Sequence, residues 1–407
     1  MRTGNIAVIG AQLGDEAKAR TVHWFSQHNH NRHYVIRWSG GANAGHTLYH
    51  NGKKIVRHLL PSADFSNPDC HAFLGSGMVI NLEELLQEVK DTDAMFPGAG
   101  APYRITVDPD AFVVLPKHLK EDKENVVKFG STGRGISPCY RDKVNRCGIK
   151  IGDLFKFDTS LEDQRDLVQA LMNKGVRFSY AVREAIMFDR SDLIFEGAQS
   201  VMLDQNFGAY PYVSSGECTL GGIFNAGFAQ YMPKTVYGVI KPYTTAVGKM
   251  PFPTEQLNDW GNKVREQGHE FGATTGRPRR IGALDFPALR YSIAKGGITH
   301  LILTKLDILN GMENIPVCRN YEHGDPISGQ DFFSAKPVIE ETKGWKTIDD
   351  KDYSDEQLWN FIRLVEGETK GETIVSHLSW GTGEKEMTGV ASYGDSYWLV
   401  DAEGKQL

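Results

Sequence analysis

Two acidic side chains follow a glycine-rich turn near the start of the sequence. The segment from Gly10 to Arg20 contains Asp15 and Glu16, followed by Lys18. A strand that runs through glycines into a helix places backbone N–H groups and the positive end of the helix dipole around an anion. The Gly-x4-Gly-Lys-[Ser/Thr] spacing of a P-loop is absent. Because two carboxylates would repel a bound phosphate, we expect one of them to hold Mg²⁺ or to act as a base; a plain strand-to-helix turn is the alternative.

A second glycine-rich turn contains a histidine that could act as a general acid. His46 lies in the segment from Gly40 to Thr47, and histidine side chains exchange protons near neutral pH. A single histidine after a glycine is more often structural. If the two turns end adjacent strands, His46 lies near Asp15, and this pairing favours the catalytic interpretation.

The segment from Thr304 to Asp307 has the residue types of a guanine pocket. It follows the apolar run from Leu301 to Leu303. The carboxylate of Asp307 could accept hydrogen bonds from N1–H and the 2-amino group of guanine together, which adenine cannot offer. The stem of Lys305 could lie over the base. An ion pair at the end of a strand is the alternative.

The segment from Thr274 to Arg280 concentrates three guanidinium groups and two hydroxyl groups around a turn. Arginine side chains bind carboxylates and phosphates through paired hydrogen bonds, so we expect a dicarboxylate or polyphosphate ligand. A solvated basic loop is the alternative. Two further segments, Gly130 to Gly135 and Glu196 to Gln199, have the composition of ligand loops, and each is a weak pattern alone.

These segments need a scaffold that brings strand ends together, and the sequence predicts one. Short apolar runs alternate with amphipathic stretches, which is typical of an α/β fold with a mostly parallel sheet covered on both faces. In such sheets ligands bind beyond the carboxyl ends of the strands. The predicted strands are residues 5–9, 34–37, 193–195, 236–240, 301–303 and 373–375. The predicted helices are residues 17–26, one capped by Asn81, and one capped by Ser160 and ended by Gly175.

The chain has 407 residues, 40% of them hydrophobic, and a formal net charge of −6. This length normally suggests two or three domains, but no repeat or linker divides the chain, so one large α/β domain is also possible. No apolar stretch is long enough to cross a membrane, and no signal-peptide pattern is present. The acidic excess argues against general nucleic-acid binding. Five cysteines without a CxxC pair indicate reduced thiols and a cytoplasmic location.

Eight segments, in this order, resemble the motifs of the adenylosuccinate synthetase family. They are Gly14-Asp15-Glu16, Asn43 to Thr47, Ser131 to Ile136, Phe195 to Gln199, Tyr210 to Val213, Pro251 to Glu255, Phe271 to Arg277 and Thr304 to Asp307. The resemblance extends over nearly the whole chain, from residue 5 to about residue 390. It implies a single α/β domain over residues 1–407, with a central, mostly parallel sheet flanked by helices.

The resemblance also implies an activity, a cofactor and an assembly. A carbon–nitrogen ligase of this family joins L-aspartate to C6 of IMP in purine nucleotide biosynthesis. GTP phosphorylates the 6-oxygen of IMP, and the aspartate amine then displaces phosphate to give adenylosuccinate. The implied cofactor is Mg²⁺, the implied assembly is a homodimer, and neither a nucleic acid nor a membrane is an expected partner.

The matching residues divide by role. Asp15 matches the base that removes the N1 proton of the purine, and His46 matches the acid that neutralises charge on the transferring phosphoryl group. Asp15 and the carbonyl group of Gly45 would hold Mg²⁺. The expected ligand contacts are Asn43, Thr132, Gln199, Ser214, Arg277 and, from the neighbouring subunit, Arg146 for IMP; Thr274, Thr275, Arg277 and Arg279 for aspartate; and Gly14, Glu16, Ala17, Lys18, Thr47, Arg279, Lys305 and Asp307 for GTP.

Four features depart from the family pattern. In the phosphate turn, Ala17, Ala19 and Arg20 replace two glycines and a lysine, and in the arginine-rich segment Pro278 replaces an arginine. The helical stretch between Ile151 and Ile194 is shorter than in the family. The sequence from Ser376 to Gly383 stands in place of a Ser-Thr-Gly-Pro nucleotide turn. The added methyl groups could crowd the phosphate turn.

These departures leave two alternatives open. One is a phage-type branch of the family, which joins aspartate to dGMP and can use ATP or GTP. This branch often lacks the catalytic aspartate, so the presence of Asp15 favours IMP. The other is a guanine-nucleotide-binding protein without ligase activity.

Overall fold

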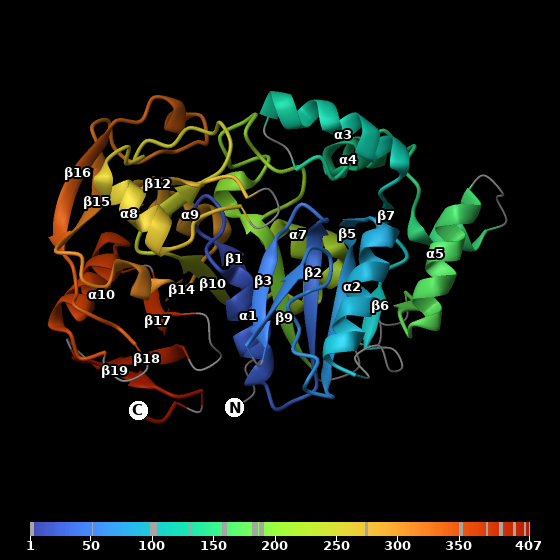
Figure 1. Cartoon of the computed structure of the whole chain (residues 1–407), viewed down its shortest axis with the longest axis horizontal. Coiled ribbons are helices and arrows are strands. Elements are labelled where there is room, and N and C mark those ends of the chain that lie inside the picture. The colour runs from blue at the N-terminus through green and yellow to red at the C-terminus, as the bar shows by residue number, and fades with distance from the viewer. Residues whose placement is uncertain are drawn as a thin grey trace.

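In the computed structural model, twelve strands of the described part of the chain form one large sheet (Figure 1). Their order is β19-β18-β17-β14-β10-β1-β9-β2-β5-β6-β8, and β7 pairs with β5. The bounds are β1 Ile6–Gly10, β2 His33–Gly40, β5 Cys70–Ile80, β6 Ile105–Val107, β7 Phe112–Val113, β8 Arg177–Phe178, β9 Asp192–Ser200, β10 Thr235–Ile240, β14 His300–Leu303, β17 Ile374–Ser379, β18 Met387–Tyr393 and β19 Ser396–Val400. Two pairs of neighbouring strands in this sheet, β17–β18 and β18–β19, are antiparallel, and the other pairs are parallel. The prediction of a mostly parallel sheet is therefore confirmed.

Smaller sheets and the helices surround this sheet. The additional strands are β3 His46–His50 with β4 Lys53–Arg57, β11 Thr244–Ala246 with β12 Arg280–Gly282, and β13 Leu284–Asp285 with β15 Asn314–Tyr321 and β16 Pro337–Lys343. The helices are α1 Lys18–Gln27, α2 Leu82–Met95, α3 Pro116–Phe129, α4 Ile136–Val144, α5 Glu162–Asn173, α7 Gly221–Ile223, α8 Asp259–Gln267, α9 Phe286–Gly296 and α10 Glu356–Glu368. The structure describes residues 4–50, 52–97, 104–129, 132–156, 161–180, 186, 191–272, 276–349, 353–371, 373–381, 386–393, 396–402 and 404–406.

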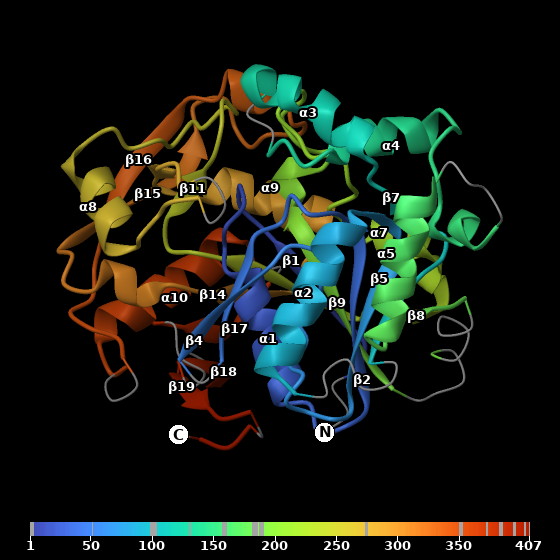
Figure 2. The same cartoon turned by 45° about the vertical axis from the view of Figure 1, so that its right-hand side comes forward.

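Helices cover both faces of the sheet because its central strands are apolar on both sides. In β1, Ile6 and Val8 pack into the core formed with α1, α2 and α5, whereas Ala7 and Ile9 pack into the core formed with α7, α9 and α10. Alternate side chains of a strand point to opposite faces, so a strand that is buried throughout must be covered twice. Figures 1 and 2 show α1 and α2 in front of the sheet and α7 behind it.

Most predicted elements are confirmed within a few residues. Asn81 caps α2, because its side chain accepts hydrogen bonds from the backbone N–H groups of Glu83 and Glu84. The helix α5 forms as predicted, although its predicted cap, Ser160, lies outside the described residues. The expectation that the segment from Ser376 to Gly383 forms a nucleotide-binding turn has to be corrected. The first four residues of this segment belong to strand β17, which ends at Ser379, whereas Thr382 and Gly383 lie outside the described residues.

No helix in the described part of the chain is long and apolar enough to cross a membrane. The five cysteines all have free thiols, as their spacing predicted.

A half-buried histidine in β17, packed among aromatic rings, predicts that acid destabilises the fold. Aromatic side chains of Trp24, Phe25 and Tyr237 surround His377, and burial lowers the pKa of His377 from 6.5 to about 3. The unfolded chain therefore binds this proton at a higher pH than the folded chain does. As the pH falls below 6.5, the free energy of unfolding should decrease by about 1.4 kcal/mol per pH unit from this group.

The measurement is chemical denaturation at several pH values for the natural chain and for His377→Phe. We expect a smaller decrease in acid for the variant. The same variant should be no more stable than the natural chain at neutral pH, where the natural histidine is uncharged. An unchanged pH dependence in the variant would contradict this assignment.

Candidate active site

The carboxyl ends of five adjacent parallel strands form the floor of the candidate site. Strand β1 pairs in parallel with β9 and β10, β9 with β2, and β10 with β14. Asp15 follows β1, His46 follows β2, Gln199 lies in β9, and Lys305 follows β14. The parallel pairing places the ends of these strands at one edge of the sheet, where the sequence predicted ligand binding. The expectation that the turns of Asp15 and His46 end adjacent strands is wrong, because β9 lies between β1 and β2.

The first turn uses its two acidic side chains in different ways. The carboxylate of Glu16 is fully buried and accepts hydrogen bonds from the backbone N–H of Gly14 at 2.8 Å and from Nζ of Lys18 at 2.7 Å. Burial alone would raise the pKa of Glu16, but Lys18 and the backbone N–H groups hold it below its ordinary value. Glu16 is therefore the internal anion of this turn, and Asp15, whose side chain is 35% exposed, is the carboxylate that can face a ligand.

Left-handed backbone geometry makes the turn tight. Asp15 has φ 60° and Ala17, which precedes the first residue of α1, has φ 68°. A side chain with a Cβ atom is strained in this region, whereas glycine is not. The substitution of alanine for the family's glycine at this position therefore has a cost in stability.

Replacing Ala17 by Gly should raise the free energy of unfolding by about 1 kcal/mol, because the φ of 68° is unstrained for glycine. Denaturant titration of the two proteins measures the change. The matched control is Ala19→Gly, inside α1, where we expect a loss of about 1 kcal/mol from lower helix propensity. Equal effects of the two substitutions would show that the backbone at Ala17 is not strained.

A buried ionic network connects Asp15 with the segment after β14. Nε of Arg279 lies 2.8 Å from Oδ2 of Asp15, and its Nη1 lies 2.5 Å from Oε2 of Glu270. Oε1 of Glu270 accepts hydrogen bonds from Nζ of Lys305 at 2.8 Å and from the hydroxyl group of Tyr243 at 2.6 Å. Glu270 thus links the residue that holds Asp15 to the predicted guanine pocket.

Three nearby cationic side chains keep the carboxylate of Glu270 ionised. Burial alone would raise the pKa of Glu270, but Lys241, Lys305 and Arg279 hold it well below its ordinary value. Burial also lowers the pKa of Lys241, to about 8. Glu270 was not among the predicted site residues; its one signal in the sequence is an acidic residue that stands shortly before the arginine-rich segment.

The ring of His46 is held by a buried carboxylate. Its Nδ1 lies 2.6 Å from Oε1 of Glu196, and its Nε2 lies 3.4 Å from the carbonyl oxygen of Ala198. Ser62 fixes Glu196 through its backbone N–H at 2.6 Å and its hydroxyl group at 2.7 Å. Burial alone would raise the pKa of Glu196, but His46, Arg37 and the N–H group of Ser62 lower it. The carboxylate is therefore ionised and orients the imidazole.

The predicted purine-nucleotide contacts are brought together only in part. The hydroxyl group of Ser214 donates to the side-chain oxygen of Gln199 at 3.3 Å, and Asn43 accepts from the N–H of Gly41 at 3.2 Å. Thr132 and Arg146 are exposed, and Arg146 follows the end of α4 with φ 62°. Among the described residues, Arg146 makes no hydrogen bond or ion pair with the other predicted contacts; its backbone N–H donates to the carbonyl oxygen of Lys143.

The arginine-rich segment separates into different environments. Arg277 is exposed, whereas Arg279 is buried against Asp15 and Glu270. Arg280 pairs with Glu255 at 2.5 Å and is therefore structural. Thr274 and Thr275 lie outside the described residues. A single solvated basic loop is therefore ruled out for the described part of this segment.

The remaining predicted nucleotide contacts lie around the same strand ends. Lys18 begins α1, Gly45 and Thr47 flank His46 at the start of β3, and all of them are buried or half-buried. Lys305 has φ 57° and pairs with Glu270 instead of Asp307. Oδ1 of Asp307 is buried and has no hydrogen-bond partner among the described residues. A buried acceptor without a donor suits a ligand that supplies one.

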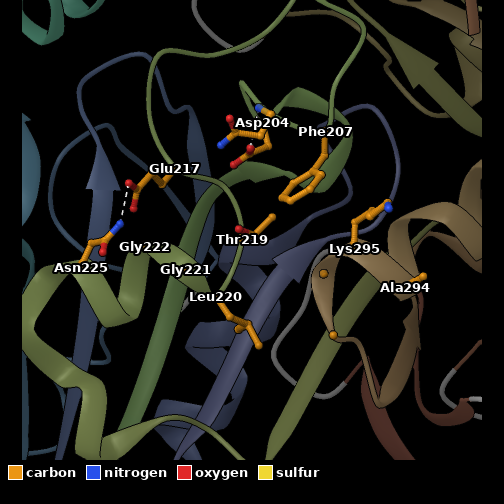
Figure 3. Close-up of a pocket in the computed structure, with 13 residues that line it drawn as sticks. Asp204, Phe207, Glu217, Thr219, Leu220, Gly221, Gly222, Asn225, Ala294 and Lys295 are labelled. Carbon is orange, nitrogen blue, oxygen red and sulfur yellow. Dashed lines mark hydrogen bonds between the residues drawn. The ribbon is translucent and has the colours of Figure 1, made fainter. Parts of the chain in front are cut away.

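A cavity of about 500 Å³ lies next to this region but carries none of the predicted site residues. Figure 3 shows Glu217 and Asn225 on one side of it and Lys295 on the other, and Nζ of Lys295 lies 6.0 Å from the centre of the Phe207 ring. Glu217 accepts a hydrogen bond from Asn225 at 2.8 Å across its wall. Because its lining contains neither Asp15 nor His46, we place the chemistry at the strand ends and not in this cavity.

Comparison with known proteins decides the family. A family model described as adenylosuccinate synthetase matches residues 7–188 and 156–388 of the chain. The chain belongs to the adenylosuccinate synthetase family. Adenylosuccinate synthetases of Petrotoga mobilis and Thermotoga maritima are 40% and 38% identical to it, over 94% of this chain and 96% and 98% of theirs. As a member of this family, the protein is a carbon–nitrogen ligase of purine biosynthesis.

Solved structures agree with the fold of this ligase family. The fully ligated adenylosuccinate synthetase of Plasmodium falciparum superposes with a TM-score of 0.83 at 32% identity, covering 94% of this chain and 99% of that one. The succinoaminodeoxyadenylate synthetase of cyanophage S-2L, bound to dGMP and dATP, gives a TM-score of 0.67 at 19% identity over 95% of this chain and 96% of that one. The second likeness supports the shared fold.

Proposed function

We propose that this family member joins L-aspartate to C6 of IMP with GTP as the phosphoryl donor, giving adenylosuccinate, GDP and phosphate. The observation that carries the proposal is the presence of two oriented groups at one edge of the sheet: the half-buried carboxylate of Asp15, held by Arg279, and the imidazole of His46, held by Glu196. They follow β1 and β2, the strands on either side of β9. The relatives that are 35–40% identical to this chain are named adenylosuccinate synthetases, which favours IMP over dGMP.

In this proposal Asp15 supplies the base. The 6-oxygen of IMP becomes nucleophilic when N1 loses its proton, and Asp15 accepts that proton. Arg279 lies 2.8 Å from Oδ2, so it fixes the carboxylate and leaves Oδ1 for the purine. The 6-oxygen then attacks the γ-phosphorus of GTP, and GDP leaves.

His46 supplies the donor for the charge that develops in this transfer. Because Glu196 holds Nδ1 at 2.6 Å, whereas the contact of Nε2 with the carbonyl oxygen of Ala198 is long at 3.4 Å, Nε2 is the ring atom that can turn to the transferring phosphoryl group and the 6-oxygen. The aspartate amine then attacks C6, and the oxygen leaves with phosphate. Arg277, Arg279, Thr274 and Thr275 are the proposed contacts of the aspartate carboxylates, while Asn43, Thr132, Gln199, Ser214, Arg277 and the partner subunit's Arg146 are those of IMP.

The proposed metal ligands fit Mg²⁺. Asp15 offers a carboxylate oxygen and Gly45 a backbone carbonyl oxygen, and hard oxygen ligands are those that Mg²⁺ prefers. When bound, Mg²⁺ would neutralise charge on the phosphates of GTP. Gly14, the backbone of Glu16, Ala17, Lys18, Thr47 and Arg279 are the proposed phosphate contacts, and Lys305 and Asp307 the proposed base contacts.

Replacing Asp307 by Asn tests the guanine assignment. The amide keeps one acceptor oxygen but replaces the other by a donor and removes the charge, so the KM for GTP should rise about 100-fold. Xanthosine triphosphate, whose 2-oxygen can accept from the new amide, should become the better donor for the variant. The change in KM is measured by steady-state kinetics, with Asp259→Asn on the outer helix α8 as control. An unchanged KM for GTP would remove Asp307 from the base pocket.

Two alternatives remain in this proposal. Ala17 and the short segment between Ile151 and Ile194 motivate a phage-type activity that joins aspartate to dGMP with ATP or GTP. The buried acceptor of Asp307 motivates a guanine-nucleotide-binding protein without ligase activity. The proposal also includes a homodimer, because Arg146 is exposed, as a residue that contributes to the site of a neighbouring subunit must be. It includes a cytoplasmic location, because the cysteine thiols are free.

A product assay distinguishes these possibilities. IMP, GMP and dGMP are each combined with GTP or ATP, L-aspartate and Mg²⁺, and phosphate and succinylated nucleotide are quantified by chromatography. We expect the highest kcat/KM with IMP and GTP. Preference for dGMP would establish the phage-type activity. Absence of turnover with every combination would contradict the ligase proposal.

A further inference from the structure

Three potential metal ligands meet on the side of α1 and β3, outside the candidate active site. His23 lies in α1, His50 ends β3, and Asp64 lies in the loop after β4. One ligand atom from each lies within 4.8 Å of the others. Figure 1 shows α1 and β3 side by side. None of these three residues has a role in the proposed ligation.

The geometry of His23 leaves one ring nitrogen for a ligand. Its Nδ1 lies 3.3 Å from the carbonyl oxygen of Ser62, and a ring nitrogen next to a carbonyl oxygen carries the proton. Nε2 then has the lone pair, is buried, and has no hydrogen-bond partner in the described part of the chain. A backbone carbonyl that orients the remote nitrogen is the usual support of a metal-binding histidine.

The electrostatic surroundings keep the His23 ring neutral. Burial lowers the pKa of His23 to about 4, although Asp64 raises it. A neutral imidazole can coordinate a metal ion without first losing a proton. Arg57 is the nearby cation; its Nη1 donates to the carbonyl oxygens of Pro61 and Ala63, and the carboxylates of Glu88, Glu196 and Asp64 act against its charge.

The other two groups complete a mixed nitrogen and oxygen set. The ring of His50 meets that of His23 edge-on, with 6.5 Å between centroids. Asp64 is buried; the hydroxyl oxygen of Ser66 lies 2.7–2.8 Å from its two carboxylate oxygens, and the backbone N–H of Ser66 donates to Oδ1 at 3.0 Å. A hydrogen-bonded carboxylate with remaining lone pairs is an oriented ligand. Two imidazoles and one carboxylate suit Zn²⁺ and its neighbours among the transition metals more than Mg²⁺ or Ca²⁺.

We propose that His23, His50 and Asp64 form a binding site for a divalent transition-metal ion of the zinc class, with a water molecule as the fourth ligand. Tetrahedral bonds of about 2 Å require ligand atoms about 3.3 Å apart, so the three side chains move toward one another when the ion binds. The ion fastens the β3–β4 hairpin to α1. His46 begins this hairpin and Lys18 begins this helix, so the site supports the elements that carry both residues.

The test titrates metal-free protein, prepared with a chelator, with Co²⁺ as a spectroscopic probe and then with Zn²⁺ in competition. We expect one equivalent of Co²⁺ with the intense visible absorption of a tetrahedral complex, displaced by one equivalent of Zn²⁺. Zn²⁺ should also raise the Tm by an amount that grows with its concentration. The titration uses Asp15→Asn as a second host, so that the proposed Mg²⁺ site cannot supply the signal.

Three substitutions identify the ligands. His50→Gln, at a half-buried position, should fold and bind Co²⁺ at least about 100-fold more weakly. Asp64→Asn and His23→Phe should have similar effects where circular dichroism shows a folded chain. The control is His30→Gln, which removes an exposed histidine outside the cluster and should bind normally. Absence of the tetrahedral spectrum, or equal affinities of His50→Gln and His30→Gln, would overturn the proposal.

Discussion

Replacing Asp15 by Asn should lower the kcat of ligation about 10⁴-fold while the protein remains folded. Asparagine keeps the shape of the side chain but cannot take the N1 proton of the purine. The fold should persist for two reasons. Asparagine tolerates the left-handed backbone that Asp15 adopts at φ 60°, and Arg279 keeps its ion pair with Glu270.

The measurement is single-turnover ligation of IMP, with circular dichroism and Tm as tests of folding. Asp69→Asn is the matched control. Asp69 is exposed and precedes β5, at the edge of the sheet opposite the strand ends that form the site, so its substitution should leave kcat unchanged. Retention of natural activity by Asp15→Asn would show that another group takes the proton.

Replacing His46 by Gln should lower kcat about 10²- to 10³-fold, with a smaller change in the KM for IMP, because the lost donor acts on charge that develops during phosphoryl transfer. Glu196 would lose its contact with Nδ1 but would keep both hydrogen bonds from Ser62 and the nearby charge of Arg37. We therefore expect a folded protein. The exposed His30 provides the control substitution, His30→Gln.

A double-variant comparison separates the role of Glu196 from that of His46. Glu196→Gln removes the charge that orients the ring and should reduce kcat less than His46→Gln does. If Glu196 acts only through His46, the double variant should be as slow as His46→Gln alone. If the double variant instead lowers kcat by the product of the two separate factors, Glu196 has an independent role.

The positions of the strand ends could be predicted from the sequence because they depend on local patterns. An apolar run that is followed by glycines and polar residues identifies the end of a buried strand, and this placed Asp15, His46 and Lys305 correctly after β1, β2 and β14. The cap at Asn81 is equally local, since its side chain bonds to the backbone two and three residues later.

The pairing of charged side chains could not be predicted in this way. Glu270 lies 35 residues before Lys305 in the sequence, and nothing in the spacing indicates that one buried carboxylate serves Lys305 and Arg279 together. Nor did the sequence show that Glu16 turns inward to the N–H of Gly14 while Asp15 stays accessible. Adjacent residues differ here because of backbone angles that depend on the folded turn.

Ser376 to Ser379 illustrates a third kind of error. The segment resembles a turn when it is compared with the family motif, but it forms part of β17, paired with β14 on one side and β18 on the other. Tertiary pairing overrides local pattern at such positions.

Isotope transfer from the purine tests the central claim most directly. IMP labelled with oxygen-18 at C6 is converted in the presence of GTP, L-aspartate and Mg²⁺, and the released phosphate is analysed by mass spectrometry. Because the 6-oxygen captures the γ-phosphorus and later leaves with it, each phosphate released should carry one labelled oxygen. Formation of adenylosuccinate together with unlabelled phosphate would contradict the account.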